Sequence, residues 1–347
     1  MRPIVSAALV GALLIGATAC TDSGGGGATG SPPAPATVTN PTTSSTAAPP
    51  SSTDPVADET DTAVSVASAG TTGDDDTPPA RLDPRVAGGL DADGFAVRLS
   101  ESHAVMVDQG ADPADRARAG VDHQLVLREL AARPELDDAV LGAVDPSAGP
   151  AVERVVRARQ FLQQRSASRP PQPPPLELPA WTIVEPEPVE MLRAHYAEAE
   201  RLTGIAWYWL AAIHLQETRM GRIRGVSSAG AVGPMQFLPT TWEVCCTGDP
   251  TVTRDAIVGA ATYLAQSGGP DDMAAALYEY NPNDGYVAVV TAYAESLRDE
   301  PELLSGYHAY QVFVGTAAGT VRLPVGYSAA EPHDAAAYLA AHPADAA

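Results

Sequence analysis

The chain has 347 residues, which is long enough for one sizeable hydrophobic core together with accessory segments. It carries 43 Asp and Glu side chains against 21 Lys and Arg, for a net charge of −22. A charge of this sign repels nucleic-acid phosphates and anionic lipid headgroups, so the composition argues against nucleic acid as a partner.

Residues 1–19 have the features of a secretory signal peptide. Arg2 provides a basic start, and residues 4–15 form an apolar stretch that is too short to persist as a membrane-spanning helix. Small residues at Ala17 and Ala19 suit cleavage, and Cys20 directly after them resembles the lipobox of bacterial lipoproteins. Lipoboxes usually carry Leu where this chain has Ala17. We predict that Cys20 is lipidated. The exported protein would then lie on the outer face of the cytoplasmic membrane or in the cell wall. The alternative is a secreted protein with a free thiol at Cys20.

Residues 20–80 are predicted to be a disordered tether. They consist mainly of Gly, Ser, Thr, Pro, Ala and Asp, and too few large apolar side chains are present to offset the entropy of ordering the chain. About 60 residues of flexible chain have a root-mean-square span of roughly 40 Å. The tether would therefore let an anchored domain search the space above the membrane.

Residues 81–168 are predicted to form a helical accessory region whose own chemistry the sequence does not reveal. Asp112 followed by Pro113 is typical of a helix N-cap with proline at the first helical position. A second helix is expected over about residues 150–164, where apolar residues recur at helical spacing. The proline-rich residues 169–178 would then be a stiff, extended linker.

Residues 179–300 contain the strongest helical patterns. An amphipathic helix is expected over residues 189–202, stopping at Gly204, and residues 205–215 are apolar nearly all round, which indicates a buried central helix. Three more helices are expected, from Thr253 to about Gly268, from Asp271 or Asp272 through residue 277, and after Asp284.

Residues 301–328 are expected to be a β-rich extension. Residues 310–314 and 320–324 have strand composition and flank two glycines, which predicts a hairpin. Residues 329–347 are left as a C-terminal tail.

Cys245 and Cys246 are adjacent in the chain. A compartment that favours disulfides offers them no other partner. Neighbouring Cα atoms lie only about 3.8 Å apart across a trans peptide, so a bond between these cysteines would be strained. A vicinal disulfide and two reduced thiols both stay open, and a metal site is not expected because no His lies nearby in sequence.

Glu217 stands at the end of the predicted buried helix and faces a glycine-rich turn. A charge at the end of so apolar a helix is costly unless it is paired or functional. Partial desolvation raises the pKa of a Glu side chain, which makes it a usable general acid near neutral pH. The alternative is that Glu217 merely ends its helix in solvent.

Further motifs follow Glu217-Thr218 in a fixed order. They are Ser227…Gly230…Gly233-x-Met235-Gln236, then Tyr280-Asn281, with Tyr286 beyond. In this order and at these distances they resemble the lytic transglycosylase family, the lysozyme-like (SLT-domain) enzymes of murein, and most closely its actinobacterial and membrane-bound B-type members. The usual signatures are Glu-Ser, Gly-Leu-Met-Gln and Ala-Tyr-Asn; here they read Glu-Thr, Gly-Pro-Met-Gln and Glu-Tyr-Asn. The resemblance covers about residues 188–299.

The patterns and the resemblance together predict a mostly α protein. They imply a lysozyme-like α-helical catalytic domain with a long cleft, an additional N-terminal helical region and a small C-terminal β-hairpin. Glu217 would be the single catalytic acid/base, with no metal or cofactor required. Contacts to the substrate or to Glu217 would come from Ser227, Gln236, Tyr280, Asn281 and Tyr286. Alternatively, Gln236 bonds the backbone and the two tyrosines belong to the core, as Met235 and Phe237 are expected to.

The same resemblance implies that the substrate is the glycan strand of peptidoglycan. Glu217 would protonate the oxygen between N-acetylmuramic acid and N-acetylglucosamine, and then take the proton of the muramyl C6 hydroxyl as a 1,6-anhydro ring closes. Two rivals are a hydrolytic muramidase of the same fold and a non-catalytic cell-wall-binding protein. Arg219, Arg222 and Arg224 are expected to be ordinary solvated charges rather than contacts to anionic wall groups.

Overall fold

The computed structural model describes residues 89–167 and 173–347. The predicted signal peptide, Cys20 and the predicted tether lie outside the described residues, as does the middle of the proline-rich stretch. All described residues belong to one unit of the chain.

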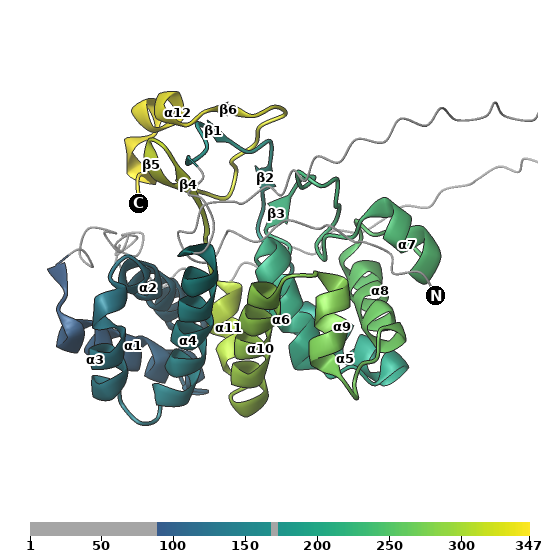
Figure 1. Ribbon diagram of the computed structural model, residues 1–347, viewed down its shortest axis with the longest axis horizontal. Helices are drawn as coiled ribbons and strands as arrows, with labels where there is room; N and C mark the ends of the chain where they lie inside the picture. Colours follow the sequence, from purple (N-terminus) through teal and green to yellow (C-terminus); the bar gives the residue numbers. More distant parts are fainter. Residues whose placement is uncertain (1–88, 168–172) are drawn as a thin grey trace, which may run out of the picture. The chain divides into compact units, whose positions relative to one another are not determined.

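Helices dominate the described residues, which confirms a mostly α fold. In chain order they are α1 (Ala92–Val107), α2 (Pro113–Ala131), α3 (Asp137–Ala143), α4 (Gly149–Ala167), α5 (Val189–Thr203), α6 (Trp207–Thr218), α7 (Pro239–Cys245), α8 (Thr253–Gln266), α9 (Met273–Tyr280), α10 (Asp284–Asp299), α11 (Leu303–His308) and α12 (Ala335–Ala341) (Figure 1). The strands are short: β1 (Glu177–Leu178), β2 (Thr182–Ile183), β3 (Ile223–Arg224), β4 (Val312–Thr316), β5 (Gly319–Leu323) and β6 (His333–Asp334).

Local signals in the sequence fix several helix ends. Asp112 caps α2 by accepting a hydrogen bond from the backbone N–H of Ala114, with proline at the first helical position. Gly204, in the left-handed region at φ 79°, ends α5 as expected. The start of α10 differs slightly from the prediction. Asn283, not Asp284, is the N-cap, because its side-chain oxygen accepts from the backbone N–H groups of Gly285 and Tyr286.

The largest hydrophobic core surrounds α6. Nine residues of this helix are buried, and they pack against α5, α8 and α10. A second core lies within the accessory helices, around Phe95, Leu99 and Leu130. The polar members of this buried set all lie in the last five residues of α6, so the C-terminal end of the helix carries its polar groups; they are His214, Gln216, Glu217 and Thr218.

The accessory helices pack directly on the helices that follow the proline-rich stretch. Helix α4 lies beside α10 (Figure 1). Gln124 of α2 exchanges two hydrogen bonds with the backbone of Gln311, at 3.0 and 2.7 Å. His123, also of α2, bonds the hydroxyl of Tyr310 at 2.9 Å. The accessory helices and the helices around α6 thus share one packed body.

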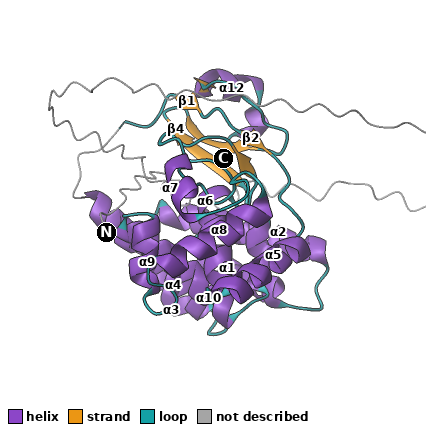
Figure 2. Cartoon of the chain, turned by 90° about the vertical axis from the view of Figure 1, so that its right-hand side faces the viewer, coloured by secondary structure: helices purple, strands orange, loops and turns teal. Residues whose placement is uncertain are grey.

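The strands gather in one small region (Figure 2). Strands β4 and β5 form the expected antiparallel hairpin, with Val312 opposite Leu323. Strand β1 pairs with β6 and β2 pairs with β3, both antiparallel. Leu178, Ile183 and Val321 are among the side chains of a third, smaller core beneath them. The segment 329–347, expected only as a tail, therefore contributes a strand and helix α12.

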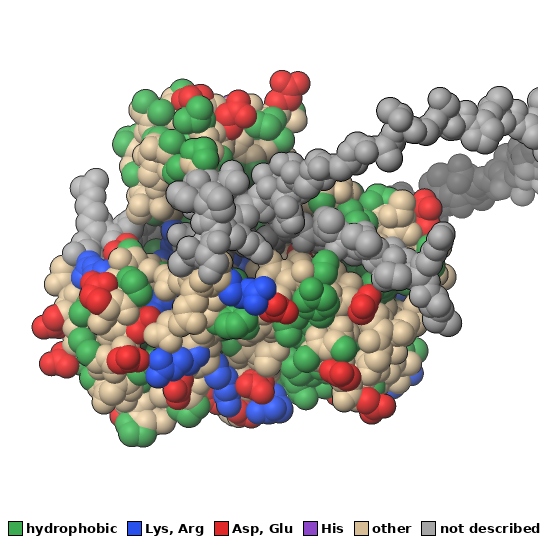
Figure 3. Space-filling view, in the orientation of Figure 1, with side chains coloured by type: hydrophobic (Ala, Val, Ile, Leu, Met, Phe, Trp, Pro, Cys, Tyr) green, Lys and Arg blue, Asp and Glu red, His purple; other side chains and the backbone are tan. Residues whose placement is uncertain are grey.

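Acidic and basic side chains are interspersed on the face that Figure 3 presents. Arg154, for example, pairs with both Glu295 and Asp299. None of the helices within the described ranges is both long and apolar enough to span a bilayer.

Candidate active site

Glu217 lies in the last turn of α6 and is only 4 % exposed. Its neighbours Gln216 and Thr218 are buried too, at 6 % and 1 %. The alternative in which Glu217 ends its helix in solvent is therefore wrong.

Burial changes the acidity of this carboxyl. Desolvation raises the pKa of Glu217 from 4.5 to about 8, and an interaction with the Tyr286 hydroxyl offsets part of the rise. Within the described part of the chain, neither Glu217 Oε2 nor the Tyr286 hydroxyl has a hydrogen-bond partner of normal geometry. Burial thus raises the pKa of Glu217 as expected, so its carboxyl holds its proton to a higher pH than an exposed Glu does.

The chain reverses sharply after Glu217. Arg219 and Met220 have φ values of 56° and 57°, a left-handed conformation that costs side chains with a Cβ about 1 kcal/mol or more each. The Thr218 hydroxyl donates to the carbonyl oxygen of Pro234 at 2.6 Å and accepts from the N–H of Gly221 at 3.0 Å. These bonds tie the end of α6 to the Gly233–Gln236 turn.

That turn is fixed by tight packing. Gly233 has φ 76°, and a Cβ there would overlap the carbonyl oxygen of Pro250, so no other residue fits without movement. Gln236 has φ 52°, and its side-chain nitrogen donates to the carbonyl oxygen of Gly233 at 2.9 Å. Gln236 thus serves the backbone here, the alternative considered from the sequence. Ser227 also makes a local bond, since its hydroxyl accepts from the N–H of Ala231 at 2.9 Å.

Two buried tyrosines stand beside Glu217. The Tyr280 hydroxyl, at the end of α9, donates to the carbonyl oxygen of Met235 at 2.6 Å. The ring of Tyr286, in the first turn of α10, stacks on that of Tyr280 with centroids 6.4 Å apart. Burial, followed by the charge of Glu217, raises the pKa of both hydroxyls well above 10. Asn281 is buried at the C-terminal end of α9.

The structure therefore brings Glu217, Tyr280 and Tyr286 into mutual interaction. Ser227 and Gln236 make their hydrogen bonds within the neighbouring turns. Met235 and Phe237 are buried, as expected. Sequence reasoning missed Thr218 as the residue that ties the two turns together, although the Glu-Ser signature, read here as Glu-Thr, keeps a hydroxyl at this position.

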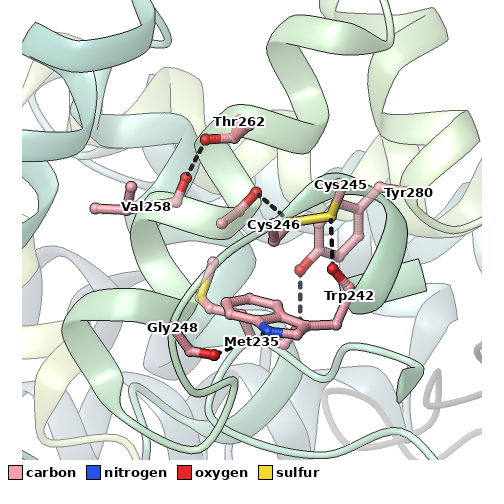
Figure 4. The surroundings of a disulfide bond; sticks show 9 residues. Met235, Trp242, Cys245, Cys246, Gly248, Val258, Thr262 and Tyr280 are labelled. Carbon is pink, nitrogen blue, oxygen red and sulfur yellow. Dashed lines mark hydrogen bonds between the residues drawn. A yellow bond between two sulfur atoms is a disulfide. The ribbon is translucent and has the colours of Figure 1, made fainter. Parts of the chain in front are cut away.

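Cys245 and Cys246 are joined in a vicinal disulfide (Figure 4). Cys246 Sγ contacts the carbonyl oxygen of Gly259 in α8 at 3.5 Å. Nearby, the Trp242 indole donates to the carbonyl oxygen of Gly248 at 3.2 Å and packs on the ring of Phe237, with centroids 5.0 Å apart. The disulfide thus stands at the outer edge of the aromatic cluster that contains Tyr280.

The expectation that the nearby arginines are solvated charges is wrong for two of them. Arg219 is 1 % exposed, and burial lowers its pKa to about 10. Arg222 is also buried; it pairs with Glu185 at 3.3 Å and donates to the carbonyl oxygen of His308 at 3.2 Å. Both side chains fold inward because the chain reverses at the end of α6, so neither is free to meet a wall polymer.

No group of three or more His, Cys, Asp or Glu side chains within residues 89–167 and 173–347 is placed to hold a metal ion.

No protein-family model matches the chain, and no solved structure does. The chain is similar to the membrane-bound lytic murein transglycosylase F of Thiobacillus denitrificans, with 32% identity over 124 residues. The similarity covers 33% of this chain and 26% of that relative, so the chain spans about a quarter of the relative's length. This similarity supports the lytic transglycosylase family for the chain.

Proposed function

We propose that this chain is a peptidoglycan lytic transglycosylase that cleaves the β-1,4 bond between N-acetylmuramic acid and N-acetylglucosamine and leaves a 1,6-anhydromuramyl end. The observation that carries the proposal is Glu217, a buried carboxyl with a pKa of about 8. It stands beside Tyr280 and Tyr286 in a chain similar to a lytic murein transglycosylase.

The first step uses the protonated form of Glu217. At neutral pH its carboxyl holds a proton, which passes to the glycosidic oxygen as the bond from that oxygen to C1 breaks. The carboxylate left behind is stabilised by the Tyr286 hydroxyl. The acetamido oxygen of the muramyl residue stabilises the positive charge that develops at C1.

The second step restores the enzyme. The Glu217 carboxylate accepts the proton of the muramyl C6 hydroxyl while O6 forms a new bond to C1. One proton is given and one is taken back, so no water is consumed. A hydroxyl already held beside C1 has a large effective-molarity advantage over water.

The scarcity of other acids near Glu217 favours this route over hydrolysis. Glycosidases that use water generally need a second carboxylate to position it or to form a covalent intermediate. The candidates in the same part of the chain are all exposed, and within the described residues none contributes to the pKa of Glu217: they are Glu243, Asp249, Asp271, Asp272 and Glu279.

The finer assignments belong to the same proposal. Contacts to the N-acetyl sugars are assigned to Ser227 and Gln236. Bonds to Glu217 or to the substrate are assigned to Tyr280, Asn281 and Tyr286. The domain division at residues 179–300, the lipid on Cys20 as the membrane anchor, the cell-wall location and the actinobacterial and B-type affinity are parts of it as well.

Mass spectrometry of the muropeptides released from purified peptidoglycan tests the proposal, since an anhydro end differs from a reducing end by one water. We expect mainly 1,6-anhydro ends with the wild type and no release with Glu217→Gln. Mainly reducing ends would replace the proposal with a muramidase. Binding without any release would replace it with a wall-binding protein.

A further inference from the structure

Helix α4 of the accessory region packs against the first turn of α10. A Cβ on Gly285 would overlap the side chain of Leu162, so Leu162 rests directly on the backbone of this turn. One helical turn further along α4, Arg165 pairs with Asp284 at 2.8 Å. Both partners of that pair are about half exposed, so the pair contributes little, and the apolar contact is the main restraint.

The same turn carries Tyr286. The side-chain oxygen of Asn283 accepts hydrogen bonds from the N–H groups of Gly285 and Tyr286, at 2.8 and 3.3 Å, and so caps the N-terminus of α10. Tyr286 follows Gly285 directly and interacts with the carboxyl of Glu217. The residue that contacts α4 and the residue that interacts with the proposed acid are thus neighbours in the chain.

The position of Tyr286 depends on this backbone. Its hydroxyl has no hydrogen-bond partner of normal geometry within the described ranges that would fix it on its own. Helix ends fray unless packing or capping holds them. What keeps the hydroxyl beside Glu217 is therefore the cap of Asn283, the stacking on Tyr280 and the packing of Leu162.

We propose that α4 of the accessory region is a positioning element for the active site, with Leu162, packed on Gly285, holding Tyr286 beside Glu217. The proposal rests on the proposed function for its catalytic meaning and on the packing alone for its geometry. It gives α4, in an accessory region whose chemistry the sequence does not reveal, a role in the reaction.

The pKa of Glu217 reports the position of Tyr286. The titratable side chains that interact with Glu217 are Tyr286 from α10 and Tyr280 from α9. The Tyr286 hydroxyl lowers the pKa of Glu217, so its loss or withdrawal raises that pKa further. A packing defect at Leu162 that displaces Tyr286 should therefore also raise the pKa of Glu217, as removal of the hydroxyl does.

The experiment is a double-mutant cycle in the full-length protein. The pKa of Glu217 is measured by ¹³C NMR of its side-chain carboxyl in the wild type, Leu162→Ala, Tyr286→Phe and the double variant. We expect Tyr286→Phe to raise the pKa of Glu217 by up to about one unit, because it removes the hydroxyl that lowers this pKa. Leu162→Ala should raise it by part of that amount in the wild type and not at all in the Tyr286→Phe background.

Two matched variants separate positioning from general loosening. Leu141→Ala removes another partly buried leucine, one in α3 that packs on the core of the accessory helices. It should leave the pKa of Glu217 and the rate of lysis unchanged. Leu162→Met keeps the volume and should restore both. In the lytic assay Leu162→Ala should lower kcat about tenfold with KM unchanged, as expected for a misplaced group.

Equal shifts of the pKa in both backgrounds, no shift, a downward shift or the same shift in Leu141→Ala would each overturn the positioning role. If Leu162→Ala does not fold, Leu162→Val makes a smaller defect and takes its place with the same expected pattern. The pKa cycle needs no substrate. If the wild type shows no lytic activity, the proposed function is refuted. The pKa measurements would still test whether Leu162 positions Tyr286.

Discussion

Replacing Glu217 with Gln should make the protein more stable at neutral and alkaline pH while it abolishes lysis. In the folded chain the carboxyl keeps its proton up to a pKa of about 8, whereas in the unfolded chain it ionises near 4.5. Between those values the unfolded state has released a proton that the folded state still holds. Stability therefore falls as the pH rises through this window, and Gln, which cannot ionise, is spared that loss.

The size of the effect follows from the shift. One pKa unit corresponds to about 1.36 kcal/mol, so the destabilisation by Glu217 should grow by about 3 to 4 kcal/mol between pH 5 and pH 8. Above pH 8 both states are ionised and the difference becomes constant. The amide brings its own unsatisfied groups into the site, but that contribution does not vary with pH and drops out of the slope.

Urea unfolding of the wild type and Glu217→Gln at a series of pH values measures this difference. The free energy of unfolding of the variant minus that of the wild type should rise from pH 5 to pH 8 and then level off. Lysis should fall by about 10² to 10⁴, the usual contribution of a general acid/base. A difference that stays flat with pH would refute the burial of an acid at Glu217. Near wild-type lysis would refute its catalytic role.

Further predictions concern the surroundings. Gly233→Ala should destabilise the fold by about 2 to 4 kcal/mol, because a left-handed φ and the overlap with Pro250 act together; an unchanged urea midpoint would contradict this. In a Cys20→Ala chain that is unfolded without reductant, thiol titration should find neither Cys245 nor Cys246 free, and two free thiols would show that the pair is reduced. Cys20→Ala should also move the protein from the membrane fraction to the soluble fraction, so unchanged membrane association would count against the lipid anchor. Single amide replacements of the exposed carboxylates should leave most of the lytic activity, and a loss as large as that of Glu217→Gln would point to a second acid at that position; the set is Glu243, Asp249, Asp271, Asp272 and Glu279.

Helices with strong local signals were predictable from the sequence. The apolar run after Gly204 could only be a buried helix, and the structure buries it as α6. Asp112 with Pro113 is an equally local signal, and so is the strand composition around the two glycines of the hairpin 312–323. In each of these, a cap, a breaker or a periodicity decides the structure within about ten residues of chain.

Features that depend on distant contacts were not predictable. Strands β1 and β6 are two residues each and more than 150 positions apart, so no local pattern marks either of them. Arg219 is buried because the chain reverses after α6, and the local sequence around Arg219 gives no sign of this. The contact between Leu162 and Gly285 joins two helices that the sequence separates by a proline-rich stretch, and it is visible only once they pack.

The non-glycine residues with a left-handed backbone lie in two turns of the described chain. Within residues 89–167 and 173–347 these residues are Arg219, Met220 and Gln236, and they lie in the two turns after Glu217 that the Thr218 hydroxyl ties together. Within the same ranges, Glu217 Oε2 and the Tyr286 hydroxyl have no hydrogen-bond partner of normal geometry. Strained backbone and unpaired buried polar atoms each lower stability, and they persist where the surrounding structure over-determines them. The packing of α4 on the first turn of α10 is one such surrounding restraint. A substitution that loosens it should therefore change the pKa of Glu217 more readily than it lowers the stability of the fold.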